Sequence, residues 1–259
     1  MIHYKTAEEI ELLGASNQLV SKTLAEVAKR ISPGVTTLEL DQVAEEFIRD
    51  HSAVPGFLGY KGYPKTLCTS VNQQVVHGIP SGYVLKEGDI VSVDCGVLFQ
   101  GYYGDSAYTF AVGEVTDRVR LLLKTTRESL YRGIEHAREG KRVGDIGNAI
   151  QEYCEREKFS VVREMVGHGI GKSLHESPEV PNYGRKGHGP RLQAGMVICI
   201  EPMINMGKKD ITQDADGWTI HTADRLPSAH FEHCVAIGKN GAELLSTFEY
   251  IEAVYNVSI

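Results

Sequence analysis

The sequence lacks the cysteine spacing of a disulfide framework or a thiolate zinc site. Its five cysteines are an odd number, they stand far apart, and no Cys-x-x-Cys pair occurs. Disulfide scaffolds and zinc modules use even or closely spaced sets. We therefore expect reduced thiols in a cytoplasmic protein. The cysteines are Cys68, Cys95, Cys154, Cys199 and Cys234.

Long apolar runs and a basic excess are also missing. A membrane helix needs about 20 consecutive apolar residues, and no stretch reaches that length. The opening residues MIHYKTAEEIELLG show no cationic segment before an apolar one, so no secretory signal is expected. The net charge of -7 and the pI of about 5.8 argue against a nucleic-acid partner, which would need a basic surface.

What remains is the profile of one globular domain. The 259 residues are 42% hydrophobic and 24% charged, and no Pro/Gly/Ser-rich linker divides them. The pattern predicts two helices followed by several strands, and this order occurs twice, in halves of about 1–115 and 116–259. This indicates an α+β fold with two similar halves, between which a site could draw residues from both.

Local signals support that order of elements. Thr6 with Glu9, and Thr36 with Glu39, have the capping-box spacing of helix starts. The first helix should stop at Ser32-Pro33-Gly34. Further helices are expected at about 117–139 and 144–157, and strands near 67–71, 90–99, 102–112, 160–166, 196–204 and 229–237.

Two aspartates stand in consecutive strand patterns. If Gln100-Gly101 is a two-residue turn, Gly96 faces Asp105, and Asp94 lies diagonally across from Asp105 on the same sheet face. Such diagonal neighbours are about 7–8 Å apart at the backbone. Two buried acids aimed together repel unless a cation lies between them. The alternative is that each acid merely tolerates an edge or a loop.

The second half supplies a matching set. Glu201 and Glu232 each follow apolar stretches, and His168 lies in Gly167-His168-Gly169-Ile170-Gly171, where glycines let the backbone approach a ligand closely. Taken singly, each acid also fits a surface-facing strand position, and a lone histidine is more often structural. Together, four carboxylates and one imidazole suit two divalent ions such as Mn²⁺, Fe²⁺, Co²⁺ or Zn²⁺. A pair of such ions activates water for amide hydrolysis.

At this point the chain resembles a known family, the methionine aminopeptidases of the bacterial type I kind. The likeness covers essentially the whole chain, and six motifs in this order carry it. They are His77-Gly78-Ile79-Pro80, Val93-Asp94-Cys95-Gly96, Gly104-Asp105-Ser106-Ala107, Gly167-His168-Gly169-Ile170-Gly171, Ile200-Glu201-Pro202-Met203 and Phe231-Glu232-His233.

The resemblance implies the pita-bread fold, two pseudo-symmetric halves around a central antiparallel sheet, as a single catalytic domain spanning residues 1–259. It also implies a dinuclear metal centre of cobalt, manganese, iron(II) or zinc that removes the initiator methionine before a small second residue. The metal ligands it implies are Asp94, Asp105, His168, Glu201 and Glu232, with Asp105 and Glu232 bridging.

The same resemblance assigns roles around the metals. Glu201 relays a proton from the bridging water, and His77 and His175 contact the substrate near the scissile peptide. The methionine pocket it implies is lined by Phe57, Tyr60, Tyr63, Cys68 and Trp218. Aromatic rings and a thiol suit a polarisable thioether, although loop packing alone would also explain the tyrosines.

Three positions depart from the pattern of many relatives and bear on pocket shape. Lys61 stands where a histidine is common, Leu174 stands where an aromatic residue is common, and Phe57 stands where a small residue or cysteine is common. The implied partners are the N-termini of nascent polypeptides, with a monomeric enzyme. The basic loop 184–191 is a candidate ribosome contact, against the simpler interpretation of a solvated loop.

Three rival functions fit parts of the pattern. A prolidase or Xaa-Pro aminopeptidase shares the five ligands, but the approximately 76 residues before His77 are too few for the extra domain that such enzymes usually carry. A non-catalytic relative would typically have lost ligands. A di-iron redox protein of the ferritin type would place Glu-x-x-His on helices, whereas these acids lie in strand patterns.

Overall fold

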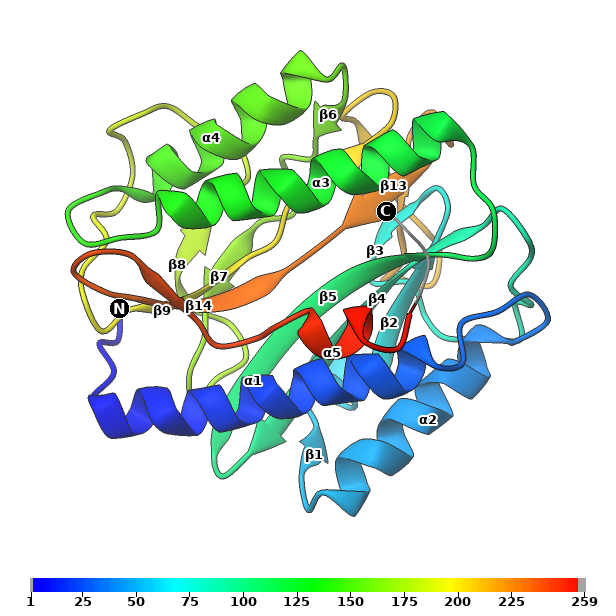
Figure 1. Cartoon of the computed structure of the whole chain (residues 1–259), viewed down its shortest axis with the longest axis horizontal. Coiled ribbons are helices and arrows are strands. Elements are labelled where there is room, and N and C mark those ends of the chain that lie inside the picture. The colour runs from blue at the N-terminus through cyan, green and yellow to red at the C-terminus, as the bar shows by residue number, and fades with distance from the viewer. Residues whose placement is uncertain (1, 256–259) are drawn as a thin grey trace.

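Two pairs of helices enclose the strands of the molecule (Figure 1). In this view α1 (Ala7–Ala28) and α2 (Thr37–Asp50) lie below the strands, and α3 (Asp117–Glu135) and α4 (Val143–Arg156) lie above them. The computed structural model describes residues 2–255. Helices combined with antiparallel strands confirm the predicted α+β class.

The helix starts agree with the sequence signals. At α1 the backbone N–H of Glu9 donates to Thr6 Oγ1 at 3.3 Å, and Glu9 Oε2 accepts from the N–H of Thr6 at 3.0 Å. Thr36 and Glu39 form the same reciprocal cap at α2. These contacts satisfy amides that the first helical turn leaves free.

The third helix ends at Glu135, four residues earlier than the predicted 139. Beyond it the backbone pairs with other segments: Glu139 N–H donates to Gly238 O at 3.0 Å, and Gly140 N–H donates to Leu192 O at 3.1 Å. Because those amides bond to distant carbonyls, they are not available for another helical turn. Periodicity alone does not reveal such competition.

Within the described residues, the strands form four small antiparallel sheets. In the first, β4 (Ile90–Phe99) pairs with β5 (Tyr102–Ala111) along one edge and with β1 (Val54–Pro55) and β2 (Leu67–Val71) along the other. The second has the order β15 (Ala242–Leu244), β14 (His233–Ile237), β9 (Val197–Ile200), β7 (Gly167–Gly169), β8 (Glu176–Val180).

The two remaining sheets have three strands each. One has the order β13 (Ser228–His230), β10 (Met203–Asn205), β6 (Ser160–Val161), and the other has the order β11 (Ile211–Gln213), β12 (Ile220–Thr222), β3 (Gln74–Val76). A short 3₁₀ helix, η1 (Tyr60–Gly62), and a final short helix, α5 (Glu249–Glu252), complete the elements.

Two of the predicted strands, 196–204 and 229–237, are each interrupted at an acid. Glu201-Pro202 separates β9 from β10, and Phe231-Glu232 separates β13 from β14. Ile200 pairs with His233, and Met203 pairs with His230, so the two interruptions lie opposite one another. Proline lacks a backbone N–H, which weakens pairing at this point. The predicted strand 160–166 is likewise limited to the two residues of β6.

At the interruption, the β13–β14 segment bonds instead to β5 of the other half. The N–H of Glu232 donates to Ala107 O at 2.9 Å, and Ser106 Oγ donates to Glu232 O at 2.7 Å. One step along, Thr109 Oγ1 donates to His230 O at 2.7 Å. These bonds join the sheets of the two halves edge to edge and place Glu232 beside the middle of β5.

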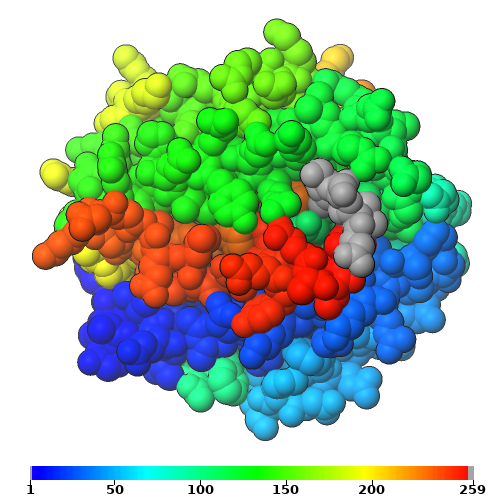
Figure 2. All heavy atoms as spheres, viewed as in Figure 1, coloured from blue at the N-terminus to red at the C-terminus, as the bar shows by residue number. Residues whose placement is uncertain are grey.

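A band formed by the segment from β14 to α5 lies between α1 and α3 on the face shown in Figure 2. Thr247 N–H donates to Ser21 Oγ of α1, and Arg127 of α3 pairs with Glu252 of α5. Within residues 2–255, no helix is both long enough and apolar enough to cross a membrane. The division into one domain with two equivalent halves stays a prediction.

Candidate metal centre

The five predicted metal ligands lie on neighbouring strands around the join between the two halves. The spatial order is β4 and β5 of one sheet, then β14, β9 and β7 of the next. Asp94 is in β4, Asp105 in β5, Glu232 just before β14, Glu201 just after β9, and His168 in β7. All five line one cavity of about 300 Å³.

The hairpin geometry expected from the sequence is present. Phe99 pairs with Tyr102, Gly96 pairs with Asp105, and Asp94 pairs with Ala107. Asp94 and Asp105 are therefore diagonal neighbours on the same face of the β4–β5 pair. The pairing register is thus what brings the two carboxylates together.

His168 approaches two of the acids without a hydrogen bond to either. Its Nε2 lies 3.8 Å from Asp105 Oδ2 and 3.6 Å from Glu201 Oε1. These distances exceed those of hydrogen bonds. They match two ligand atoms that share one cation, because bonds of about 2.1 Å at an angle near 120° separate the ligand atoms by about 3.6 Å. The arrangement therefore fits a metal ligand set.

The acids are electrostatically strained as a metal-free group. Burial raises the pKa of Asp105, Glu201 and Glu232 well above the usual carboxyl range, and the neighbouring carboxylates raise it further. Burial also raises the pKa of Asp94. The same burial lowers the pKa of His168 to about 4, so its ring is neutral at pH 7. Neutral imidazole and carboxylate are the forms that bind metals.

Unpaired buried atoms support the same interpretation. Asp94 Oδ1, Asp105 Oδ1 and Glu232 Oε1 are buried and have no hydrogen-bond partner within the described part of the chain. Buried polar atoms without partners are costly, and buried charges are normally paired or bound to metals. The donor set, four carboxylates with one imidazole, is therefore suited to divalent cations.

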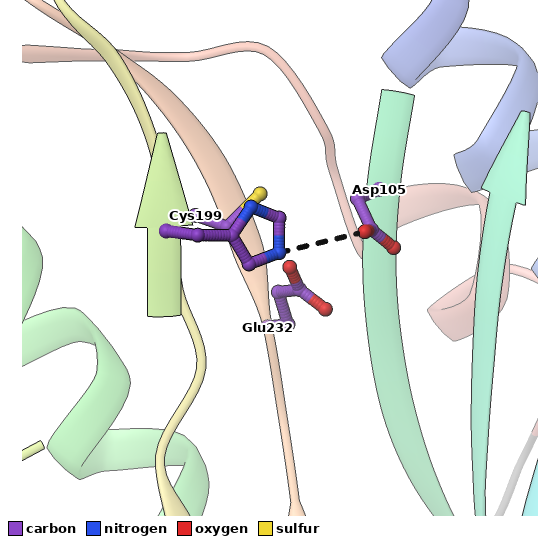
Figure 3. Close-up of side chains that lie close together, drawn as sticks. Asp105, Cys199 and Glu232 are labelled. Carbon is purple, nitrogen blue, oxygen red and sulfur yellow. Dashed lines mark ion pairs between the residues drawn. The ribbon is translucent and has the colours of Figure 1, made fainter. Parts of the chain in front are cut away.

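Cys199 is a neighbour of this group that the sequence analysis did not assign to the site. Its Sγ and one ligand atom each of Asp105, His168 and Glu232 lie within 4.8 Å of one another. In Figure 3 the imidazole ring lies between the Cys199 thiol and the Asp105 carboxyl group, Glu232 lies beside the ring, and the dashed line marks the Asp105–His168 ion pair. Burial raises the pKa of Cys199 well above the usual thiol range, and the nearby Glu232 carboxyl group raises it further. The sequence signal that could have assigned Cys199 to the site is its position two residues before Glu201.

The glycines around His168 serve close packing rather than a turn. A Cβ on Gly167 would lie 2.3 Å from Cys199 O, and a Cβ on Gly169 would lie 2.4 Å from Ser177 O. Both contacts are with backbone, which has no room to move. Only glycine lets β7 approach β8 and β9 closely enough to hold His168 at the cavity.

His77 and His175, the two predicted substrate-contacting histidines, also line the cavity. His77 has a φ of 60°, a left-handed conformation that is uncommon outside glycine. The His175 ring lies 4.1 Å from the His168 ring, centroid to centroid, and its Nδ1 lies 2.9 Å from the hydroxyl of Tyr60. Both imidazoles therefore lie beside the carboxylate cluster.

All five predicted pocket residues line the same cavity, namely Phe57, Tyr60, Tyr63, Cys68 and Trp218. Seven further residues, which the sequence analysis did not assign to the site, also line it: Lys61, Val76, Glu164, Met165, Val166, Leu174 and Met203. Tyr63 is held by its hydroxyl, which donates to Leu67 O at 2.9 Å and to Gly78 O at 3.1 Å. Its ring meets Trp218 edge-on, with centroids 5.0 Å apart. The result is an apolar chamber with one thiol beside the acids.

All three positions that depart from the family pattern lie in this wall. Phe57 packs on Gly96, where an added Cβ would come within 2.4 Å of its ring. Leu174 is buried, and Lys61 is exposed. The Lys61 Nζ lies 5.3 Å from the centre of the Tyr60 ring. The departures therefore affect the pocket and its mouth, and none replaces a predicted metal ligand.

Comparison with known proteins shows the family of the chain. The model of metallopeptidase family M24 matches residues 11–239. A methionine aminopeptidase of Clostridium perfringens is 51% identical over 246 residues, which are 95% of this chain and 99% of the relative. Methionine aminopeptidase 1 of Bacillus subtilis is 48% identical over the same shares of both chains.

Solved structures confirm the pita-bread fold. The crystal structure of methionine aminopeptidase from Rickettsia prowazekii matches with a TM-score of 0.94 at 42% identity, covering 95% of this chain and 100% of that one. A prolidase from Pyrococcus furiosus matches with a TM-score of 0.75 at 24% identity, over 66% of its length, and shares the fold. The family match spans the strands that carry all five predicted ligands, and the chain belongs to metallopeptidase family M24.

Proposed function

We propose that this protein is a methionine aminopeptidase, which hydrolyses the first peptide bond of polypeptides that begin with methionine. One observation carries the proposal: the five metal-ligand candidates, both histidines and the aromatic pocket line a single cavity. Relatives up to 51% identical over nearly the full chain are named for the same activity. The second residue of the substrate would be small and uncharged.

The metal-binding role belongs to Asp94, Asp105, His168, Glu201 and Glu232. Two divalent cations, when bound there, supply an activated water and polarise the substrate carbonyl. Cobalt, manganese, iron(II) and zinc all suit this mixture of oxygen and nitrogen ligands. Asp105 and Glu232 face each other across the join of the halves and are the proposed bridging pair.

The remaining groups handle the substrate and its protons. Glu201 takes a proton from the attacking water and delivers it to the leaving amine, as a general base and then a general acid. His175 and His77 hold the scissile peptide, and an imidazole N–H stabilises negative charge that develops on the carbonyl oxygen. The free α-amine of the substrate would lie at the carboxylate cluster, which limits cleavage to the first residue.

The pocket explains the preference for methionine. Phe57, Tyr63 and Trp218 surround the space with rings, and Cys68 adds a thiol. A thioether is apolar and polarisable and packs well against aromatic rings. Burial of such a side chain contributes about 1.5–3 kcal/mol, which favours methionine over smaller or charged first residues.

The cellular setting follows from the same proposal. Natural substrates would be the N-termini of nascent polypeptides, processed in the cytoplasm by a monomer. The loop 184–191 carries Arg185 and Lys186, and Lys186 lies 3.4 Å from Glu152 at an exposed site. If this loop meets the ribosome, charge reversal at Arg185 and Lys186 weakens ribosome binding. Unchanged binding would restrict the loop to a solvated role.

The decisive test is hydrolysis of Met-Gly-Met-Met by metal-free protein supplied with Mn²⁺, Fe²⁺, Co²⁺ or Zn²⁺ in turn. We expect metal-dependent release of free methionine, and no release from the N-acetylated peptide. Leu-Gly-Met-Met and an Xaa-Pro peptide serve as controls. Preferential cleavage of the Xaa-Pro peptide would favour the prolidase alternative. Absence of any cleavage by metal-loaded protein would favour a non-catalytic member of the fold.

A further inference from the structure

His230 is a buried imidazole to which the proposed reaction gives no role. It is the last residue of β13 and is 1% exposed. Its Nε2 has no hydrogen-bond partner among residues 2–255 and lies 3.7 Å from Oε2 of Glu201. An unpaired buried polar atom costs free energy, so its place beside a carboxylate of the site needs an explanation.

Glu201 lies between two imidazoles, one at each oxygen. Oε1 is 3.6 Å from Nε2 of His168, and Oε2 is 3.7 Å from Nε2 of His230. His168 is a metal-ligand candidate, so Oε1 is the oxygen on the cation side. Oε2 is then turned away from the cation and toward His230. The two oxygens of Glu201 are therefore in different environments.

The backbone of His230 is fixed on both sides. Its N–H donates to Thr109 Oγ1 at 2.9 Å, and its carbonyl accepts from the same hydroxyl at 2.7 Å. Thr109 in turn hydrogen-bonds to Ser92 of β4 at 2.8 Å. The backbone of His230 is thus held against the β4–β5 pair, which carries Asp94 and Asp105, although His230 and Glu201 both belong to the second half. A contact between them would fix the carboxylate relative to Asp94 and Asp105.

The ring can serve as a donor. An imidazole has a hydrogen on at least one ring nitrogen, whether the ring is neutral or charged. A carboxylate only accepts hydrogen bonds. The favourable arrangement therefore places that hydrogen on Nε2, which faces Glu201. Closing the gap by about 0.5 Å brings the two atoms within hydrogen-bond range.

We propose that His230 is a positioning residue for Glu201, an inference that rests on the proposed function. Its Nε2–H would hold Oε2, so that Oε1 keeps its place beside His168. Glu201 would then keep one fixed orientation, both as a metal-ligand candidate and as a proton acceptor. Partners of this kind, one step beyond the metal ligands, typically contribute 10–100-fold to metal affinity or activity.

Two variants of similar size separate hydrogen bonding from packing. His230→Gln keeps an N–H donor at the end of the side chain, and His230→Met has none. We would measure metal affinity by calorimetry, kcat and KM on Met-Gly-Met-Met, and thermal unfolding of the metal-free proteins. We expect His230→Met to lose about 10–100-fold in metal affinity and in kcat with KM little changed. We expect His230→Gln to recover most of both.

Two results would overturn the proposal. One is wild-type metal affinity and kcat in His230→Met, and the other is an equal loss in the Gln and Met variants, which would show a purely space-filling role. If the Met variant does not fold, ¹⁵N-histidine NMR of the wild-type protein decides. A protonated Nε2 that shifts on Zn²⁺ addition, and is missing from His230→Gln, supports the proposal. A hydrogen on Nδ1 instead overturns it.

The affinity and NMR measurements do not depend on peptide hydrolysis. If the wild-type protein binds metal but releases no methionine, the proposed function fails while the His230–Glu201 contact can still be established. If methionine is released normally and His230→Met matches the wild type in every measurement, only the inference about His230 fails.

Discussion

The hydroxyl of Tyr60 lies 2.9 Å from Nδ1 of His175, and the two rings are stacked with centroids 5.2 Å apart. With the hydroxyl as donor, Nδ1 is the acceptor and Nε2 carries the hydrogen of the ring. The His175 ring also lies beside His168, at 4.1 Å between centroids. Tyr60 therefore sets the tautomer in which His175 can donate to a substrate carbonyl.

This contact predicts the effect of Tyr60→Phe, which removes the hydroxyl and keeps the stacked ring. Loss of a neutral hydrogen bond costs about 0.5–1.5 kcal/mol, so kcat/KM on Met-Gly-Met-Met should fall about three- to tenfold. Metal affinity should not change, because Tyr60 is not a ligand. Tyr4→Phe, at an exposed residue in front of α1, is the matched control. An unaltered kcat/KM would show that Tyr60 does not orient His175.

Removal of one carboxylate tests the metal centre. Glu232→Ala or Asp94→Ala should abolish methionine release, because each takes a predicted ligand from the cluster. The fold should survive, since each change also relieves repulsion among buried acids. Activity, bound metal by elemental analysis and far-UV circular dichroism check the three parts of this expectation. Asp210→Ala, at an exposed loop position, is the control. Near-normal turnover by either variant would contradict the assigned ligands.

The buried acids also predict how the stability of metal-free protein depends on pH. Burial raises the pKa of Asp94 to about 7 and raises those of Asp105, Glu201 and Glu232 well above the usual carboxyl range. Above pH 6.5 the folded state therefore holds protons that the unfolded chain has lost. Stability then falls as pH rises, by about 1.4 kcal/mol per pH unit for each such proton.

The useful window for that measurement is pH 6.5–8. Below it, five histidines whose pKa burial lowers make stability rise with pH and oppose the trend; they are His77, His168, His175, His230 and His233. Above pH 8, titration of the cysteine thiols also begins to change the stability. We expect the melting temperature to decrease from pH 6.5 to 8 in the presence of a chelator, and to decrease less with saturating Zn²⁺. A flat profile without metal would show that the acids are not strained.

The features that depend on local pattern and register could be predicted from the sequence. The capping boxes at Thr6 and Thr36 are present, and the Gln100-Gly101 turn sets the register that places Asp94 diagonal to Asp105. The positions of the metal-ligand candidates followed from motifs. All twelve predicted site residues line one cavity, although their chemical roles stay predictions.

Features that depend on long-range pairing could not be predicted from the sequence. The interruptions at Glu201 and Glu232 arise because the Glu232 N–H bonds to Ala107, 125 residues earlier in the chain. Cys199 and His230 were not assigned to the site for the same reason. Each is unexceptional in its own strand and is recognised only by its neighbour from another segment, Glu232 for the thiol and Glu201 for the imidazole.

Asp216 offers a test of the substrate pocket that leaves the metals untouched. Its Oδ1 accepts the backbone N–H groups of Trp218 and Thr219, both at 2.8 Å, and its Oδ2 accepts the Thr219 hydroxyl at 2.6 Å. These bonds fix the turn that places Trp218 against Tyr63 and near His77, with ring centroids 6.3 Å apart in the latter pair.

Asp216→Ala should therefore loosen one wall of the methionine pocket. We expect KM for Met-Gly-Met-Met to rise about three- to tenfold with kcat nearly constant, because binding of the first side chain weakens in the ground state and transition state alike. Metal affinity by calorimetry should equal that of the wild type, and Asp210→Ala is again the matched surface control. If kcat or metal affinity falls instead, Trp218 and its turn support the catalytic centre itself rather than the methionine side chain.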